Sequence, residues 1–124
     1  MKIFDQKQGW RSKVNFVDAN NVFVGFDTDQ CCCEHADWFI ADTPKDTIEE
    51  RDARPDEMAG WVFDRDYFEE VSNGREFDGG GMVIFRITKD GSEKFLHLFN
   101  CHNGYYSHGF TFGAGGVVER EGAI

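Results

Sequence analysis

The most reactive side chains of this sequence crowd into one short stretch, where three consecutive cysteines run into a glutamate and a histidine. On an extended strand Cys31, Cys33 and His35 would project from one face, because side chains alternate along a strand. Thiolates and imidazoles are the ligands that zinc prefers, and Cys101 or His102 could complete a tetrahedron. One hypothesis is therefore a zinc-binding structural domain.

The spacing of these ligands weighs against a metal ion. Three ligands at alternate positions of a straight strand span about 13 Å from first to last, which is too far for one ion unless the chain bends sharply. No Cys-x-x-Cys pair occurs in the sequence. We therefore expect no cofactor and interpret the cysteines as small apolar residues of the core, with zinc as the alternative.

A cysteine nucleophile is the enzymatic hypothesis. It would use a thiolate, a histidine base and a carboxylate that orients the imidazole. The candidates for these three roles are Cys32 or Cys33, His102 or His108, and Glu34 or Asp37. The surrounding acidic residues would disfavour a thiolate, which forms beside positive charge. The sequence therefore favours a non-enzymatic protein, with Cys–His hydrolase chemistry as the weaker alternative.

Charge points to a binding function instead. The net charge is −10, and residues 42–78 alone carry 13 acidic and 5 basic side chains, a net −8. Without a basic stripe, direct binding to nucleic acid is disfavoured, whereas a basic protein partner is favoured. Aromatic residues interleave with the acidic ones, as at protein–protein interfaces. The predicted partner-binding residues are Trp61, Phe63, Asp64, Asp66, Tyr67, Phe68, Glu69 and Glu70.

The acidic, aromatic stretch also has a more ordinary interpretation. An amphipathic segment would turn its rings into the core and leave its carboxylates in water.

A further functional alternative is a pocket for a small ligand or nucleotide, lined by aromatic and histidine side chains. Its candidate residues are Trp38, Tyr105, Tyr106 and His108.

The elements that must position these residues are mostly strands. Alternating apolar residues predict a hairpin over Lys13–Asp27, and a short apolar run predicts a buried strand over Ala36–Ala41. The hairpin predicted over Met82–Cys101 turns at an Asp-Gly pair and is apolar on both faces of both strands, which places it centrally in a sheet. A further strand is predicted over Tyr105–Phe112.

One short surface helix is predicted between these strands. Thr43 can cap it with Pro44 at the first helical position, and Pro55 would stop it near Arg54. The fold class that follows is α+β, mainly antiparallel β in a roll or incomplete sandwich, with one short helix. We expect a single domain over residues 1–124.

No signal peptide or membrane span is visible, so we expect a cytoplasmic protein without a membrane partner. In that compartment the four cysteines are expected to stay reduced. The sequence gives no oligomeric state.

Two short motifs resemble those of an uncharacterised small domain family of phages and bacteria. That family pairs an early Cys-Cys-Glu segment with a late Asn-Gly-Tyr-Tyr-Ser segment. Here the matching residues are Cys32, Cys33, Glu34, Asn103, Gly104, Tyr105, Tyr106 and Ser107. The resemblance implies a small β-rich protein of phage or mobile-element origin and transfers no activity. Together with the acidic middle, it suggests a protein that docks on a basic surface of a host protein, in counter-defence or nucleic-acid mimicry.

Overall fold

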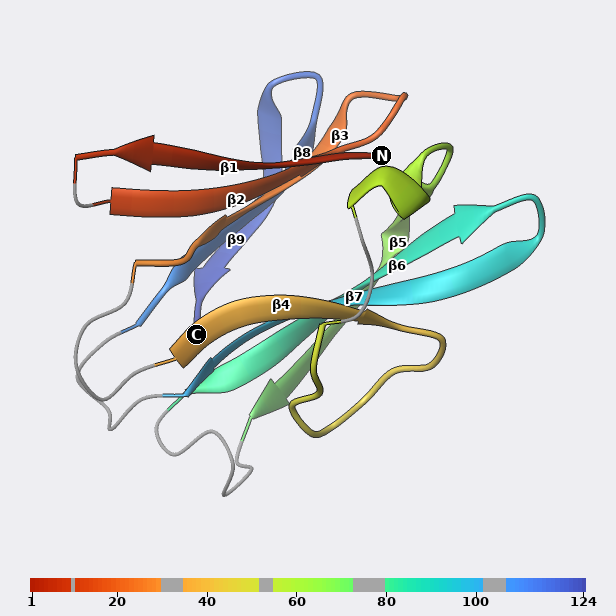
Figure 1. Ribbon diagram of the computed structural model, residues 1–124. Helices are drawn as coiled ribbons and strands as arrows, with labels where there is room; N and C mark the ends of the chain where they lie inside the picture. The colour runs from red at the N-terminus through yellow and green to blue at the C-terminus, as the bar shows by residue number, and fades with distance from the viewer. Residues whose placement is uncertain (10, 30–34, 52–54, 73–79, 102–106) are drawn as a thin grey trace.

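The chain folds into two antiparallel sheets that pack face to face, as a computed structural model shows (Figure 1). The structure describes residues 1–9, 11–29, 35–51, 55–72, 80–101 and 107–124. Among these it has nine strands and one short 3₁₀ turn. No helix in the described part of the chain has the length and apolarity needed to cross a bilayer.

The first sheet has five strands in the order β1-β2-β3-β8-β9. Their bounds are β1 Lys2–Gln8, β2 Arg11–Val17, β3 Val22–Asp27, β8 Gly109–Ala114 and β9 Val117–Ala123. The second sheet has four strands in the order β4-β7-β6-β5. Their bounds are β4 His35–Ala41, β5 Val62–Ser72, β6 Gly81–Lys89 and β7 Ser92–Cys101, and the 3₁₀ turn η1 spans Pro55–Met58.

Aromatic rings fill the space between the two sheets. Phe16 of β2 meets Trp38 of β4 edge to face, with ring centroids 5.1 Å apart. Phe63 of β5 meets Phe112 of β8 in the same way at 5.9 Å. Such pairs add to the stabilisation from burial, because the positive edge of one ring faces the negative face of the other. The inward residues of both sheets thus form one continuous core.

The second sheet also has an apolar outer face. Its buried residues there are Phe39, Met82, Ile84, Phe95 and Phe99, with Ile48 and Tyr67 packed against them. Strands β6 and β7 are therefore covered on both faces, as their two-faced apolar pattern predicts. The segment that follows β4, including Ile48, provides part of this cover.

Two hairpin turns of two residues that lie wholly within the described ranges have the geometry that right-twisted strands require. Asp90 and Gly91 join β6 to β7 with φ angles of 50° and 82°, which confirms the predicted Asp-Gly turn. Gly115 and Gly116 join β8 to β9 with φ angles of 59° and 82°. The glycine-rich stretch between β8 and β9 is therefore a tight hairpin turn.

The helix predicted over Thr43–Arg54 is not present in its described part, residues 43–51, and residues 52–54 lie outside the described residues. Instead, the backbone N–H of Lys45 donates a 3.0 Å hydrogen bond to Nε2 of buried His97 on β7. This tertiary contact and the packing of Ile48 replace a helix whose apolar face is too small to hold it. The mainly antiparallel β class is confirmed, and its architecture is a two-sheet sandwich.

Candidate functional site

The acidic stretch lies on β5, which is an edge strand of the second sheet. Phe63 pairs with Ile87 and Phe68 pairs with Phe85, so residues 64–67 together face the single residue Arg86. This wide bulge interrupts the row of backbone hydrogen bonds at the edge. Bulges of this kind re-aim side chains and keep sheet edges from pairing with other sheets.

A buried carboxylate fixes the start of the bulge. Asp18, in the turn between β2 and β3, accepts a 2.8 Å hydrogen bond from the backbone N–H of Phe63 through Oδ2. Its Oδ1 accepts 2.9 Å bonds from the backbone N–H groups of Asn20 and Val22. Charge-assisted bonds of this kind are roughly twice as strong as neutral ones. Asp18 therefore ties the turn of the first sheet to the edge of the second.

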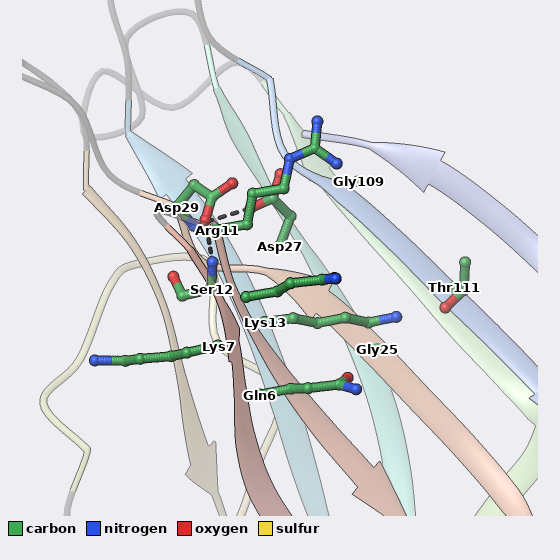
Figure 2. A pocket seen from close by; sticks show the side chains of 11 residues that line it. Gln6, Lys7, Arg11, Ser12, Lys13, Gly25, Asp27, Asp29, Gly109 and Thr111 are labelled. Carbon is green, nitrogen blue, oxygen red and sulfur yellow. Dashed lines mark hydrogen bonds between the residues drawn. The ribbon is translucent and has the colours of Figure 1, made fainter.

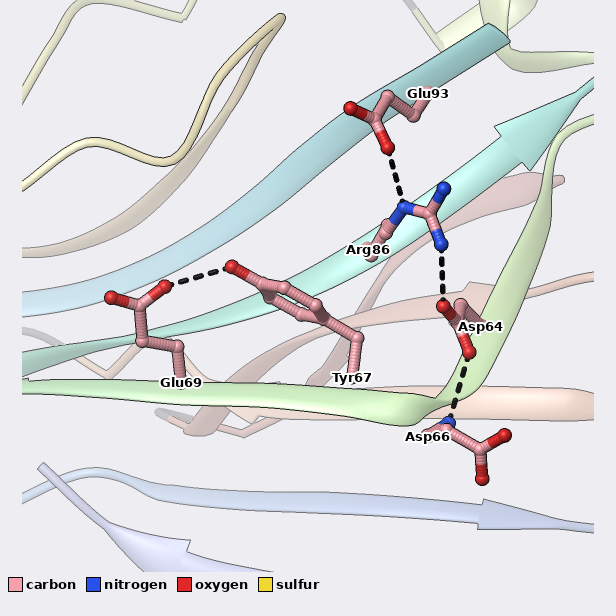
Figure 3. A network of polar contacts seen from close by, with 6 residues as sticks. All are labelled: Asp64, Asp66, Tyr67, Glu69, Arg86 and Glu93. Atoms are coloured by element: carbon pink, nitrogen blue, oxygen red, sulfur yellow. Dashed lines mark hydrogen bonds and ion pairs between the residues drawn. The ribbon is translucent and has the colours of Figure 1, made fainter. Parts of the chain in front are cut away.

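Polar contacts hold the middle of the bulge (Figure 3). Arg86 donates from Nη1 to Asp64 and from Nε to Glu93, both at 2.7 Å. These hydrogen bonds, with that to Asp64 the larger cause, raise the pKa of Arg86 above its usual value. Asp64 also accepts a 3.0 Å bond from the backbone N–H of Asp66. One cation thus holds two carboxylates, and the cluster keeps a net negative charge.

Tyr67 orients the next carboxylate. Its ring packs 5.4 Å from that of Phe95, and its hydroxyl donates a 2.8 Å hydrogen bond to Glu69 (Figure 3). Burial and, to a lesser extent, this hydrogen bond raise the pKa of Tyr67 to about 12. Tyr67 therefore stays protonated at physiological pH and remains a donor to Glu69.

The structure divides the predicted partner-binding residues into exposed, half-buried and buried ones. Asp66, Glu69 and Glu70 are exposed on the edge. Trp61 and Phe63 are buried, because β5 turns this side toward the first sheet, and they cannot anchor a partner. Phe68 and Tyr67 are half-buried against the inner and outer cores respectively. The aromatic rings serve the core and the carboxylates form the surface.

The zinc hypothesis is tested only in part. His35 on β4 lies directly opposite Cys101 on β7, so two of the predicted ligands are neighbours. Cys31, Cys33 and His102 lie outside the described residues. Within the described ranges no three potential ligands gather around one point. Zinc binding stays a prediction, and elemental analysis of untagged protein finding well under one metal per chain would remove it.

The described residues form neither the predicted cysteine–histidine active site nor the predicted aromatic ligand pocket. Their cysteines, Glu34, His102, Tyr105 and Tyr106 lie outside those residues. Trp38 is a core residue, and the cavity of about 430 Å³ beside it does not include His108 among its described lining. His108 is buried elsewhere, with Nδ1 2.7 Å from the carbonyl oxygen of Asp27. Asp37 pairs with Arg51 at 3.5 Å.

The two motif segments, apart from Ser107, lie outside the described residues. Of the residues that flank them in the sequence, His35 and Cys101 pair directly. Sequence reasoning missed a second feature, a groove of about 710 Å³ on the outer face of the first sheet. Its only sequence signals are glycines at outward positions of β3 and β8, Gly25 and Gly109.

Comparison with protein-family models, curated proteins and solved structures gives no match. The resemblance to the phage and bacterial domain family therefore stays an expectation. The acidic β5 edge combines exposed charge with a fixed framework, and it is the surface from which we infer the function.

Proposed function

We propose that this protein is a non-enzymatic binding protein whose β5 edge docks on a basic surface of another protein. The observation that carries the proposal is the exposure of Asp66, Glu69 and Glu70 on a bulged edge strand. Glu69 pairs with outward Ile84 and Glu70 pairs with inward Val83, so carboxylates flank both sides of the edge. A concave basic surface could contact all three at once.

The framework beneath the edge lowers the cost of binding. Asp18 fixes the backbone at Phe63, and Tyr67 fixes the carboxylate of Glu69. Side chains that are already ordered lose less conformational entropy when a partner binds. Arg65 is the one basic residue among bulge residues 64–67, and its ion pair with Glu119 directs its side chain toward β9. The edge therefore presents a consistent negative charge.

The proposed partner class is a protein surface that normally holds nucleic acid. Such surfaces gather lysine and arginine to replace the counterions of the phosphates. A protein with a net charge of −10 would be steered toward them at long range, and salt would weaken the encounter. A nucleic-acid-binding protein of the bacterial host fits this class. A phage or mobile element would then encode the present protein, which would act in counter-defence by mimicking nucleic acid.

The test is recovery of a partner from a bacterial lysate with tagged wild-type protein and two charge-reversed variants. One variant carries Glu69→Lys and Glu70→Lys. The matched control carries Asp46→Lys and Glu57→Lys, two exposed acidic residues outside β5. Both variants change the net charge equally.

We expect the β5 variant to bind about tenfold more weakly or worse, because like charges would then face each other. The control should keep most of its affinity, and added salt or nucleic acid should compete with the wild type. Equal losses in both variants, or full recovery with the β5 variant, would refute docking through this edge.

A further inference from the structure

The outer face of the first sheet carries a polar groove of about 710 Å³. Its floor is made of small residues from strands that are distant in sequence. Gly25 of β3 pairs with Thr111 of β8, and Gly109 lies two residues before Thr111 on the same strand. The missing side chains of these glycines leave room above the sheet.

Two long cationic side chains of β2 cross this floor (Figure 2). Lys13 extends toward Thr111, and its stem lies on Gly25, where an added Cβ would stand 2.5 Å from the Lys13 Cε. Arg11 reaches toward the Gly109 end of β8, whereas Lys7 points the opposite way (Figure 2). Across the ranges that the structure describes, no carboxylate forms an ion pair with Lys13.

Backbone N–H groups hold the two carboxylates of the groove, Asp27 and Asp29, in place. Asp29 accepts a hydrogen bond from the backbone N–H of Ser12, and Asp27 accepts one at 2.9 Å from the backbone N–H of Asp29. These bonds fix the acidic side chains and leave the Lys13 ammonium group for an incoming anion. Gln6 and Thr111 add an amide and a hydroxyl that can bond neutral hydroxyl groups.

We propose that this groove binds a small sugar phosphate. The phosphate would lie against Lys13 and Arg11, because ammonium and guanidinium groups form charge-assisted bonds with phosphate oxygens. The sugar hydroxyls would bond Gln6, Thr111 and the carboxylate of Asp27. The volume lies within the usual range for small-molecule sites, about 300–1,000 Å³. No aromatic ring occurs among the described lining residues, so these residues offer no stacking platform for a nucleotide base.

Titration of ¹⁵N-labelled protein with glucose 6-phosphate, followed by NMR, tests the proposal. Shifts should concentrate on the backbone amides of Gly25, Gly109 and Thr111, with a Kd of about 1 mM or tighter. Glucose alone and inorganic phosphate alone should each bind at least about tenfold more weakly. An equal response to inorganic phosphate, or no shift at about 10 mM glucose 6-phosphate, would overturn the assignment.

Variants make the test specific to the groove. Lys13→Gln should weaken binding about tenfold, whereas Lys2→Gln, the same charge change on an exposed lysine of β1 outside the lining of the groove, should leave it unchanged. Gly109→Ala places a methyl group on the floor, 3.8 Å from the nearest atom, so the fold tolerates it while binding weakens severalfold.

Equal effects of the two lysine changes would show general charge attraction and contradict a built site. The charge reversal at Glu69 and Glu70 lies on the other sheet and should not alter sugar phosphate binding. Loss of partner docking and loss of ligand binding are therefore separable results.

Discussion

The two sheets share one core but have opposite outer faces. The outer face of the second sheet is apolar, and its residues Phe39, Ile84 and Phe95 are almost fully buried. The outer face of the first sheet carries Lys13, Gly25 and Thr111 and is hollowed by a groove. One sheet has been covered by its own chain, and the other has been left open.

This difference separates stabilisation from binding. The segment after β4 covers the second sheet through Ile48 and through the bond from Lys45 to His97. That sheet consequently offers a partner mainly its edge, β5. The outer face of the first sheet is less buried, so its residues should contribute less to stability and can line a site for a ligand. Substitutions on the two outer faces should therefore have unequal effects.

Phe39→Ala should have the largest effect. Phe39 is 1% exposed and its ring stacks on that of His97 at 4.2 Å. Its removal should lower the free energy of unfolding by about 3–5 kcal/mol, because it loses burial and leaves a cavity. Phe23→Ala, at a half-buried position on the outer side of β3, should cost only about 1 kcal/mol. Urea denaturation of both variants measures the difference, and equal losses would contradict the contrast between the two faces.

The next effect is a loss of stability in acid. Burial lowers the pKa of His97 from 6.5 to about 4, although Glu49 and Glu69 nearby act in the opposite direction. Neutral His97 accepts from Lys45 through Nε2, and Nδ1 lies 3.0 Å from the carbonyl oxygen of Phe95, to which it donates. Protonation would remove the acceptor. The folded state therefore disfavours the proton relative to the unfolded chain.

Because the folded pKa is the lower one, this contribution is fully present above pH 6.5 and is lost as the pH falls toward 4. It amounts to about 3 kcal/mol. Unfolding curves between pH 7 and pH 4 should show that wild type loses stability faster than a His97→Phe variant, which cannot titrate. Parallel pH profiles for the two proteins would contradict the role of His97 in binding the segment that follows β4.

The smallest effect is expected at the edge itself. Tyr67→Phe removes the 2.8 Å hydrogen bond to Glu69 and keeps the packing on Phe95. The free energy of unfolding should fall by about 1 kcal/mol or less, since Glu69 is exposed and water can replace the donor. Ultraviolet titration should show one phenol with a pKa of about 12 in the wild type and its loss in the variant. A wild type without that phenol would contradict the packing of Tyr67.

Local signals predicted the strands that have strong local chemistry. The Asp-Gly turn and the two-faced apolar pattern identified the β6–β7 hairpin, and alternation identified β2 with β3. The exposed strands β1 and β9 carry little apolar pattern, so sequence reasoning passed over them. The predicted helix rested on a cap and a proline, whereas a distant histidine determines the conformation at Lys45.

The candidate sites depend on pairings that sequence spacing does not contain. Carboxylates on β5 could be recognised, but the burial of Trp61 and Phe63 follows from which face β5 turns to the first sheet. The groove needs Gly25 and Thr111 side by side, although 86 positions separate them in the chain. Antiparallel pairing of β3 with β8 brings them together, and nothing local to either strand indicates it.

Docking through the β5 edge is tested most directly by photo-crosslinking. A photoreactive phenylalanine analogue placed at Glu70, on the exposed edge, should capture a discrete basic protein in a bacterial lysate. Salt and nucleic acid should suppress the crosslink, and the same analogue placed at Glu57 should not capture that protein. Identical capture at both positions, or none at Glu70, would contradict a binding function for this edge.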